Sequence, residues 1–187
     1  MTPSHSPDLA SGWLLPGKQA TICFTIDDVH PGRSSDTYEA GGDLDQGALG
    51  HVEWLCQHHP QLRVTLLVTA DWREISPFPT RKFLSCIAYL RDHPYRTKTL
   101  PAATMLLSRH PEFVTYLKSL PQLDCALHGI YHINRGLHIA EEFGGRDRRE
   151  CQSKVQEALD ILEEVNLPWS PGMCSPAGGY RMTSPRQ

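Results

Sequence analysis

The sequence predicts a single α/β domain with a mainly parallel sheet. Short runs of β-branched and apolar residues alternate with longer segments whose apolar residues recur at helical spacing. One run, 63–69 (RVTLLVT), is apolar almost throughout, which is typical of a strand covered on both faces. Acidic and histidine residues directly follow two of the runs, at the strand ends where α/β proteins place their sites.

The predicted elements are recognised by the spacing of their apolar residues and by residues such as proline that end a helix. The first helix has Leu49, Val52 and Leu55 on one side and Pro60 after its end. The last helix has an apolar side that recurs from Val155 onward. We expect strands over 21–26, 63–69, 123–127 and 172–175, and helices over 45–58, 80–92, 111–120 and 148–165. Residues 1–18 are expected to be a flexible lead-in to a single domain over 19–187, because 187 residues suit one domain.

Composition excludes several classes of protein. The chain is 40% hydrophobic and 21% charged, as in ordinary globular proteins, and its net charge of −3 argues against a nucleic-acid partner. The basic cluster over 146–149 is interpreted as a solvated helix start. No apolar run approaches the roughly 20 residues that span a bilayer. No secretory signal is visible, so we expect a cytoplasmic protein whose six cysteines are reduced.

Four polar residues at strand ends form the candidate site. Asp27 and Asp28 follow the first strand, and His128 and His132 follow the third. Two histidines four residues apart on a helical turn face the same way and can bind one metal ion at about 2.0–2.1 Å each. Two acids after a strand can also be a solvated loop, and a lone HxxxH pair is more often structural. The joint pattern favours a divalent metal site.

The two aspartates can have different roles in a metal-dependent hydrolase, one as metal ligand and one as general base. Neighbouring residues at the end of a strand point in different directions, so one carboxylate can bind the metal while the other takes a proton from the attacking water. A set of two histidines and one aspartate accepts zinc, iron, cobalt, nickel or manganese. Zinc is our first expectation.

Three motifs resemble those of the polysaccharide deacetylase (NodB homology) family. Residues 24–28 (FTIDD) are similar to its first motif and 128–132 (HGIYH) to its second, while 175–180 (SPAGGY) look like a weak version of its third. The resemblance is closest to a divergent branch with His-Gly-x-x-His followed downstream by Glu-Phe, as at 142–143.

The resemblance implies a distorted, incomplete (β/α) barrel. It also implies that Asp27 is the general base, that Asp28, His128 and His132 bind the metal, and that Pro176 shapes the substrate groove. The implied reaction removes an acetyl group from an N-acetylated or O-acetylated carbohydrate or a related amide.

The chain departs from the family pattern in three places. Gly129 stands where serine or threonine is usual, and the third motif lacks an arginine beside its proline. Family members continue into further strands that bring a late histidine as general acid, so we expect a domain without these C-terminal strands. His30 and His138 are candidate substitutes for that histidine.

Some residues have two interpretations. Trp72 and Arg73 follow the second strand and could line a sugar groove, although packing is equally expected. Glu141 and Glu142 could join the site, but a surface helix start is the simpler interpretation. Two rival functions stay open: a non-catalytic domain that binds metal or sugar, and a non-haem iron oxygenase with two histidines and one carboxylate.

Overall fold

The computed structural model describes residues 22–33, 47–75, 98–133 and 142–176, together with Gly17 and Ala20. The longer elements are β1 (Thr25–Val29), α1 (Gly47–His58), β2 (Val64–Val68), α4 (Pro111–Ser119), β7 (Leu123–Leu127) and α5 (Arg148–Glu164). Between β2 and α4 lie the short elements β3 (Asp71–Trp72), β4 (Glu74–Ile75), β5 (Lys98–Thr99), β6 (Met105–Leu106) and the 3-10 helix η2 (Leu107–Arg109).

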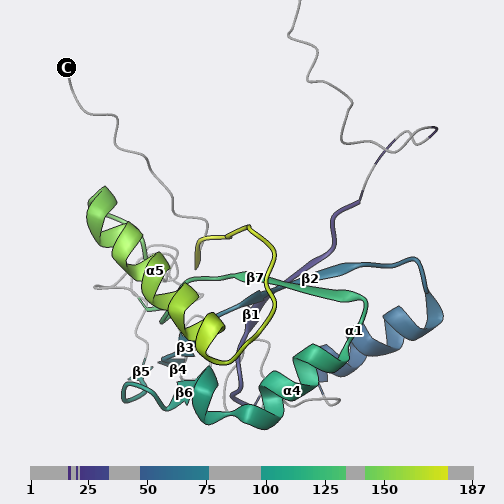
Figure 1. Cartoon of the computed structure of the whole chain (residues 1–187), viewed down its shortest axis with the longest axis horizontal. Coiled ribbons are helices and arrows are strands. Elements are labelled where there is room, and N and C mark those ends of the chain that lie inside the picture. The colour runs from purple at the N-terminus through teal and green to yellow at the C-terminus, as the bar shows by residue number, and fades with distance from the viewer. Residues whose placement is uncertain are drawn as a thin grey trace, which may run out of the picture.

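The central sheet has three parallel strands in the order β1-β2-β7 (Figure 1). Since all three run the same way, their carboxyl ends lie along one edge. An α/β fold with a parallel sheet is therefore confirmed, and no barrel is closed among the described residues. Beyond this edge, the antiparallel pairs β3-β6 and β4-β5 continue from β2.

The hydrophobic core lies between the sheet and the helices. Its members in the sheet include Leu66, Val68 and Leu127, which are at most 1% exposed. The helices contribute apolar side chains at helical spacing: Leu49, Val52 and Cys56 from α1, Phe113, Val114 and Leu117 from α4, and Ala158 and Leu162 from α5. This packing explains why the periodic segments of the sequence form helices.

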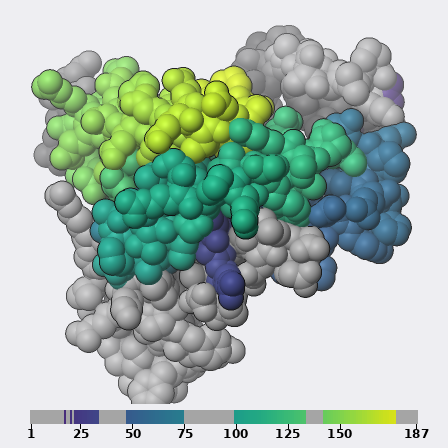
Figure 2. All heavy atoms as spheres, turned by 60° about the horizontal axis from the view of Figure 1, so that its bottom comes forward, coloured from purple at the N-terminus to yellow at the C-terminus, as the bar shows by residue number. Residues whose placement is uncertain are grey.

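Polar contacts tie the helices to one another around that core. The Tyr116 hydroxyl of α4 donates to Glu53 of α1 at 2.9 Å, and Lys118 of α4 donates to the Val165 carbonyl after α5 at 2.7 Å. In Figure 2 the green-to-yellow atoms, which include α5, lie against the teal atoms of the segment that includes α4.

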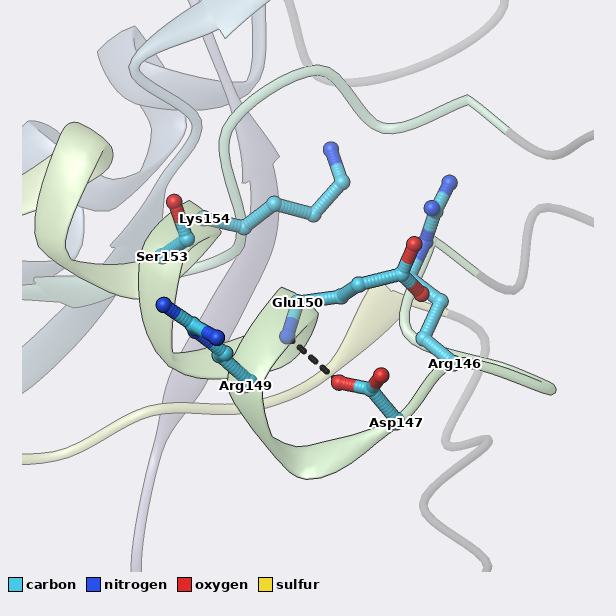
Figure 3. Close-up of a pocket in the computed structure, with 6 residues that line it drawn as sticks. All are labelled: Arg146, Asp147, Arg149, Glu150, Ser153 and Lys154. Atoms are coloured by element: carbon cyan, nitrogen blue, oxygen red, sulfur yellow. Dashed lines mark hydrogen bonds between the residues drawn. The ribbon is translucent and has the colours of Figure 1, made fainter.

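Helix α5 begins with a side-chain cap. The Asp147 carboxylate accepts the backbone N–H of Glu150 at 2.8 Å, the dashed line in Figure 3. This bond satisfies one of the free amides of the first turn. The side chains of 147–150 are exposed, so the interpretation of the basic cluster as a solvated helix start is confirmed for Arg148 and Arg149, whereas Arg146 is half-buried.

Two strand predictions need correction. The first strand, predicted over 21–26, begins only at Thr25 and extends to Val29, so it contains both aspartates, because its pairing with β2 continues to Val68 across an irregularity in register. The expected last strand over 172–175 is reduced to one parallel bridge, between Met173 and Leu127. The predicted helix over 80–92 and the predicted lead-in over 1–18, apart from Gly17, lie outside the described residues. No described helix is long and apolar enough to cross a membrane.

Candidate metal centre

A bulge at the end of β1 turns Asp28 into the site. The register between β1 and β2 shifts between Ile26 and Val29, and Asp28 adopts a left-handed conformation with a φ of 61°. A β-bulge adds a residue to one strand and redirects its side chains. Asp28 and Val29 are consequently both shielded from solvent, whereas Asp27 stays exposed.

The two histidines lie on a loop, so the prediction of a helical turn over 128–132 is wrong. His128 directly follows β7, Gly129 has a φ of 84° and His132 a φ of 51°. These left-handed residues bend the chain back, so that both imidazoles reach the same point. A spacing of four residues is compatible with such a loop as well as with a helix.

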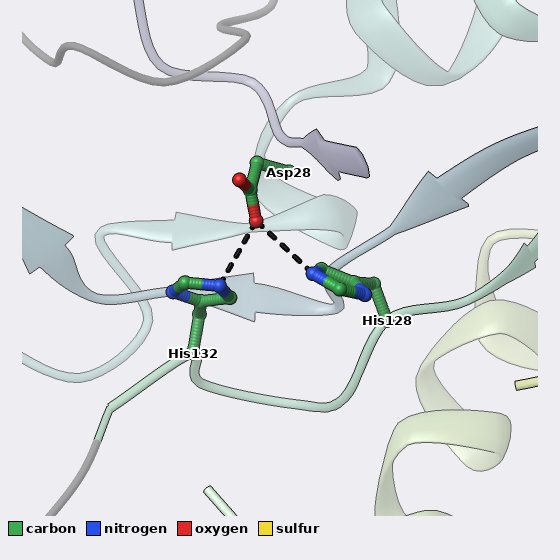
Figure 4. A group of neighbouring side chains, drawn as sticks. All are labelled: Asp28, His128 and His132. Atoms are coloured by element: carbon green, nitrogen blue, oxygen red, sulfur yellow. Dashed lines mark hydrogen bonds and ion pairs between the residues drawn. The ribbon is translucent and has the colours of Figure 1, made fainter. Parts of the chain in front are cut away.

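Three atoms that could bind a metal ion converge at the edge of the sheet. We call their residues, Asp28, His128 and His132, the donor group. Asp28 Oδ1 lies 3.0 Å from His128 Nε2 and 2.9 Å from His132 Nε2 (Figure 4). The side chains of His128 and His132 are 3% and 9% exposed, and that of Asp28 is 20% exposed. The structure thus brings together the three residues predicted as metal ligands, and their ligand atoms all lie within 4.8 Å of one another.

The opposite nitrogen of each imidazole faces an oxygen acceptor. His128 Nδ1 lies 2.9 Å from the carbonyl oxygen of Cys174, and His132 Nδ1 lies 3.1 Å from Glu74 Oε2. Both nitrogens of each ring therefore face oxygen atoms that only accept, and the tautomer that can bind a metal through Nε2 carries the proton of the neutral ring on Nδ1. Each Nε2 then presents a lone pair toward the Asp28 carboxylate.

Such a group of lone pairs needs a positive charge at its centre. In the protein without metal a proton supplies it. Burial opposes charging of His132, but hydrogen bonds to Asp28 and Glu74 outweigh burial and raise the pKa of His132 to about 9. Burial also opposes the charged form of Asp28 and on its own would raise the pKa of this carboxyl. Hydrogen bonds from His128 and His132 outweigh burial and hold the pKa of Asp28 well below its usual range.

The residues fit a divalent metal ion by three criteria. Two neutral imidazole nitrogens and a carboxylate oxygen are ordinary ligands for zinc and related metals. The separations of 3.0 and 2.9 Å from Asp28 Oδ1 to the two Nε2 atoms are close to the about 3.0 Å of octahedral ligands at about 2.1 Å from one ion, and a few tenths of an ångström shorter than the about 3.4 Å of tetrahedral ones. Finally, metal-binding histidines usually donate their other N–H to a carboxylate or carbonyl, as Glu74 and Cys174 allow here.

Asp27 lies beside this group without joining it. Its side chain is exposed, and no ligand atom of the group belongs to it. Burial raises the pKa of the Cys174 thiol, and the negative charges of Asp27 and Asp28 raise it further. Asp27 therefore acts electrostatically on the segment whose carbonyl holds His128.

The three predicted substrate residues have different environments. Trp72 is completely buried, with its ring stacked on His30 and His132 at centroid distances of 4.2 and 4.3 Å. We therefore assign Trp72 to packing and not to a sugar-binding groove. Arg73 is half-buried and donates to the Leu100 carbonyl at 3.2 Å. Pro176 is buried and lies against Gly129.

His30 has a packing environment of its own. It is completely buried, and its Nδ1 accepts the backbone N–H of Gly32 at 3.0 Å. Its ring stacks on Trp72, whose other stacking partner is the ring of His132. The other candidate for the general acid, His138, lies outside the described residues.

Two acidic residues of the site were missed or misplaced by sequence reasoning. Glu74 was not considered, yet it is buried and orients His132. Glu142 was placed on the surface, whereas it is 0% exposed and contacts the backbone of the histidine loop. Glu74 follows the second strand by only a few residues, which is the one signal that could have indicated it.

Comparisons with models of protein families, with curated proteins and with solved structures give no match for this chain. The function is therefore argued from the site itself.

Proposed function

We propose that the protein is a metal-dependent hydrolase of the deacetylase type, with zinc as its metal. The observation that carries this proposal is the convergence of His128 Nε2 and His132 Nε2 on the Asp28 carboxylate at 3.0 and 2.9 Å. The motif resemblance adds a substrate class, an acetylated carbohydrate or a related small amide. We also propose that the parallel sheet is part of a distorted, incomplete (β/α) barrel.

The residues of the chain have distinct roles in this proposal. A divalent ion would polarise an acetyl carbonyl and bring the pKa of a water toward neutrality. Asp28, His128 and His132 hold that ion, while Glu74 and the Cys174 carbonyl keep both imidazoles in the tautomer that binds it. Asp27, which is exposed and adjacent to Asp28, accepts the proton of the attacking water.

Metal content is the first test. Elemental analysis of the purified protein should give about one equivalent of metal, and the folded His128→Ala/His132→Ala variant should give none. If the parent binds no metal after reconstitution with zinc at neutral pH, the hydrolase proposal fails. A non-catalytic binding domain would then be the better description.

Replacing the proposed base should separate catalysis from metal binding. We expect Asp27→Asn to keep its metal and to lose about 10²- to 10⁴-fold of the kcat for a generic acetyl ester, because a general base contributes that much. Asp124→Asn is a matched control, since Asp124 is an exposed acid on β7 away from the donor group. Equal loss in both variants, or none in either, would contradict the role of Asp27.

A second candidate function follows from the same donor set. Two histidines and one carboxylate also form the iron site of non-haem oxygenases. Oxygen consumption by the ferrous protein would support that class. Hydrolysis is the better proposal because a second carboxylate, Asp27, adjoins the ligand Asp28.

A further inference from the structure

The Glu142 carboxylate is bound by three consecutive backbone amides. Glu142 is completely buried and precedes α5 by several residues, while the amides belong to the loop that carries the two histidines. Ile130 N–H donates to Oε2 at 3.1 Å, Tyr131 N–H to both oxygens at 3.1 Å, and His132 N–H to Oε2 at 3.0 Å. The carboxylate therefore determines the backbone path between His128 and His132.

The other side of the same loop is bound to the chain after β2. The carbonyls of Ile130 and Tyr131 accept N–H groups of Asp71 and Arg73 at 2.7 and 3.1 Å. The loop is thus held between a strand-like segment and a buried carboxylate. His132, with its φ of 51°, needs this support because a left-handed conformation is unfavourable for residues with a side chain.

Gly129 gives the carboxylate the space it occupies. A Cβ on Gly129 would lie 2.5 Å from Glu142 Oε2 and 3.1 Å from Pro176 Cγ, closer than atoms can approach without displacement. The φ of 84° at Gly129 also favours glycine. This explains in physical terms why glycine follows the first histidine in a loop supported by Glu142.

Basic residues balance the buried charge from outside. Lys154 Nζ lies 3.1 Å from Glu142 Oε1, and Arg146 Nε donates to the Glu142 carbonyl at 2.7 Å. Both residues line an open hollow of about 390 Å³ at the start of α5 (Figure 3). Lys154 and the three amides compensate the desolvation of the Glu142 carboxylate.

We infer that Glu142 is a positioning residue of the metal centre. Its carboxylate, admitted by the absence of a side chain at Gly129, fixes the loop in the conformation that directs both imidazoles at Asp28 before any metal binds. This inference rests on the proposed function, since it assumes that the three residues bind metal. Glu142 belongs to neither the ligand atoms nor the proposed base, so it acts through the backbone alone.

The variant Glu142→Gln tests this role. An amide keeps the size of the side chain but loses one acceptor oxygen and gains N–H groups, which cannot accept the loop amides. We expect zinc affinity, measured by competition with a chromophoric chelator, to fall about 10- to 100-fold. Glu157→Gln is the matched control, because Glu157 contacts the same loop through the Tyr131 hydroxyl at 2.7 Å and not through the backbone.

The outcomes distinguish this inference from the proposed function. A parent protein that binds no zinc refutes the proposed function. A parent that binds zinc, with unchanged affinity in folded Glu142→Gln or equal losses in both glutamine variants, refutes the role of Glu142 alone.

If Glu142→Gln does not fold, amide hydrogen exchange of the metal-free parent protein tests whether the histidine loop is already fixed without metal. Amides of 130–132 that are as protected as those of β7 support the inference. Amides that exchange as fast as exposed ones overturn it.

Discussion

At the scale of single residues, the most informative group is His132, because its two nitrogens face carboxylates on two different segments. Nε2 faces Asp28 and Nδ1 faces Glu74. Together these contacts make the ring a proton acceptor in the metal-free state, and the proposed metal would replace that proton. One residue thus links stability, pH and metal binding.

This coupling predicts how metal-free stability depends on pH. The folded-state pKa of His132 is about 9 and its ordinary value is 6.5, so the proton stabilises the fold fully below pH 6.5. That stabilisation is lost as the pH rises through 9, by at most about 3 kcal/mol. Urea unfolding of the chelator-treated protein at pH 6.5 and 9.5 measures it. The His132→Ala variant should show no such decline, and a parent whose stability is constant over this range would contradict the prediction.

Sequence reasoning found the ligands but not the residues that support them. Asp28, His128 and His132 could be predicted because strand ends of a parallel sheet meet at one edge. The contact of Glu74 with His132 could not be predicted, since the two residues are 58 positions apart and no local pattern relates them. Glu142 binds backbone amides, which every residue other than proline has, so its partners leave no mark in the sequence.

At the scale of elements, helix α5 is stabilised in two ways, by a side-chain cap at its first turn and by apolar side chains that it buries in the core. Its first turn is closed by Asp147, and its apolar side contributes Ala158 and Leu162 to the core. The cap lies at the surface, about three turns of helix from Ala158, and the two contributions should therefore be separable.

Removal of this cap gives a prediction about stability alone. Asp147→Ala should lower the free energy of unfolding by about 1 kcal/mol, because the N–H of Glu150 loses its acceptor. Asp160→Ala on the same helix removes only an exposed contact with Gln156 and serves as control. Denaturant titration of both variants measures the difference. A change in zinc affinity on removal of the cap would show that the cap and the metal centre are not independent.

Elements with strong patterns were predicted well and short ones were not. The ranges of β2, β7, α4 and α5 agree with the predicted ones to within one residue at each end, because their apolar runs and periodicity are unambiguous. The end of β1 was misplaced because a bulge carries the strand through two aspartates. Two-residue strands such as β3 and β6 are too short for any periodicity.

At the scale of the whole molecule, the donor group joins the two outer strands of the sheet. Asp28 belongs to β1 and His128 follows β7, while β2 lies between them. β2 gives no ligand, but the chain that follows it supplies Glu74 behind His132. The centre therefore involves all three strands.

Metal removal should accordingly destabilise the entire domain. Free zinc at 100 times its dissociation constant would add about 2.7 kcal/mol to the free energy of unfolding, equivalent to roughly 5 to 10 °C in Tm. Calorimetry with zinc and with excess chelator measures this shift. The His128→Ala/His132→Ala variant should melt at the same temperature under both conditions, and an equally small shift in the parent would argue against a metal ligated by the native fold.

The position of Asp28 and His128, 100 residues apart in the chain, has a kinetic consequence. A chain in which only β1 and β2, or only β2 and β7, have paired holds an incomplete set of ligands. If the centre binds zinc as proposed, its uptake during refolding has to wait for the last of these long-range pairings, which form slowly. Uptake of the ion during refolding would therefore report the completion of the three-stranded sheet.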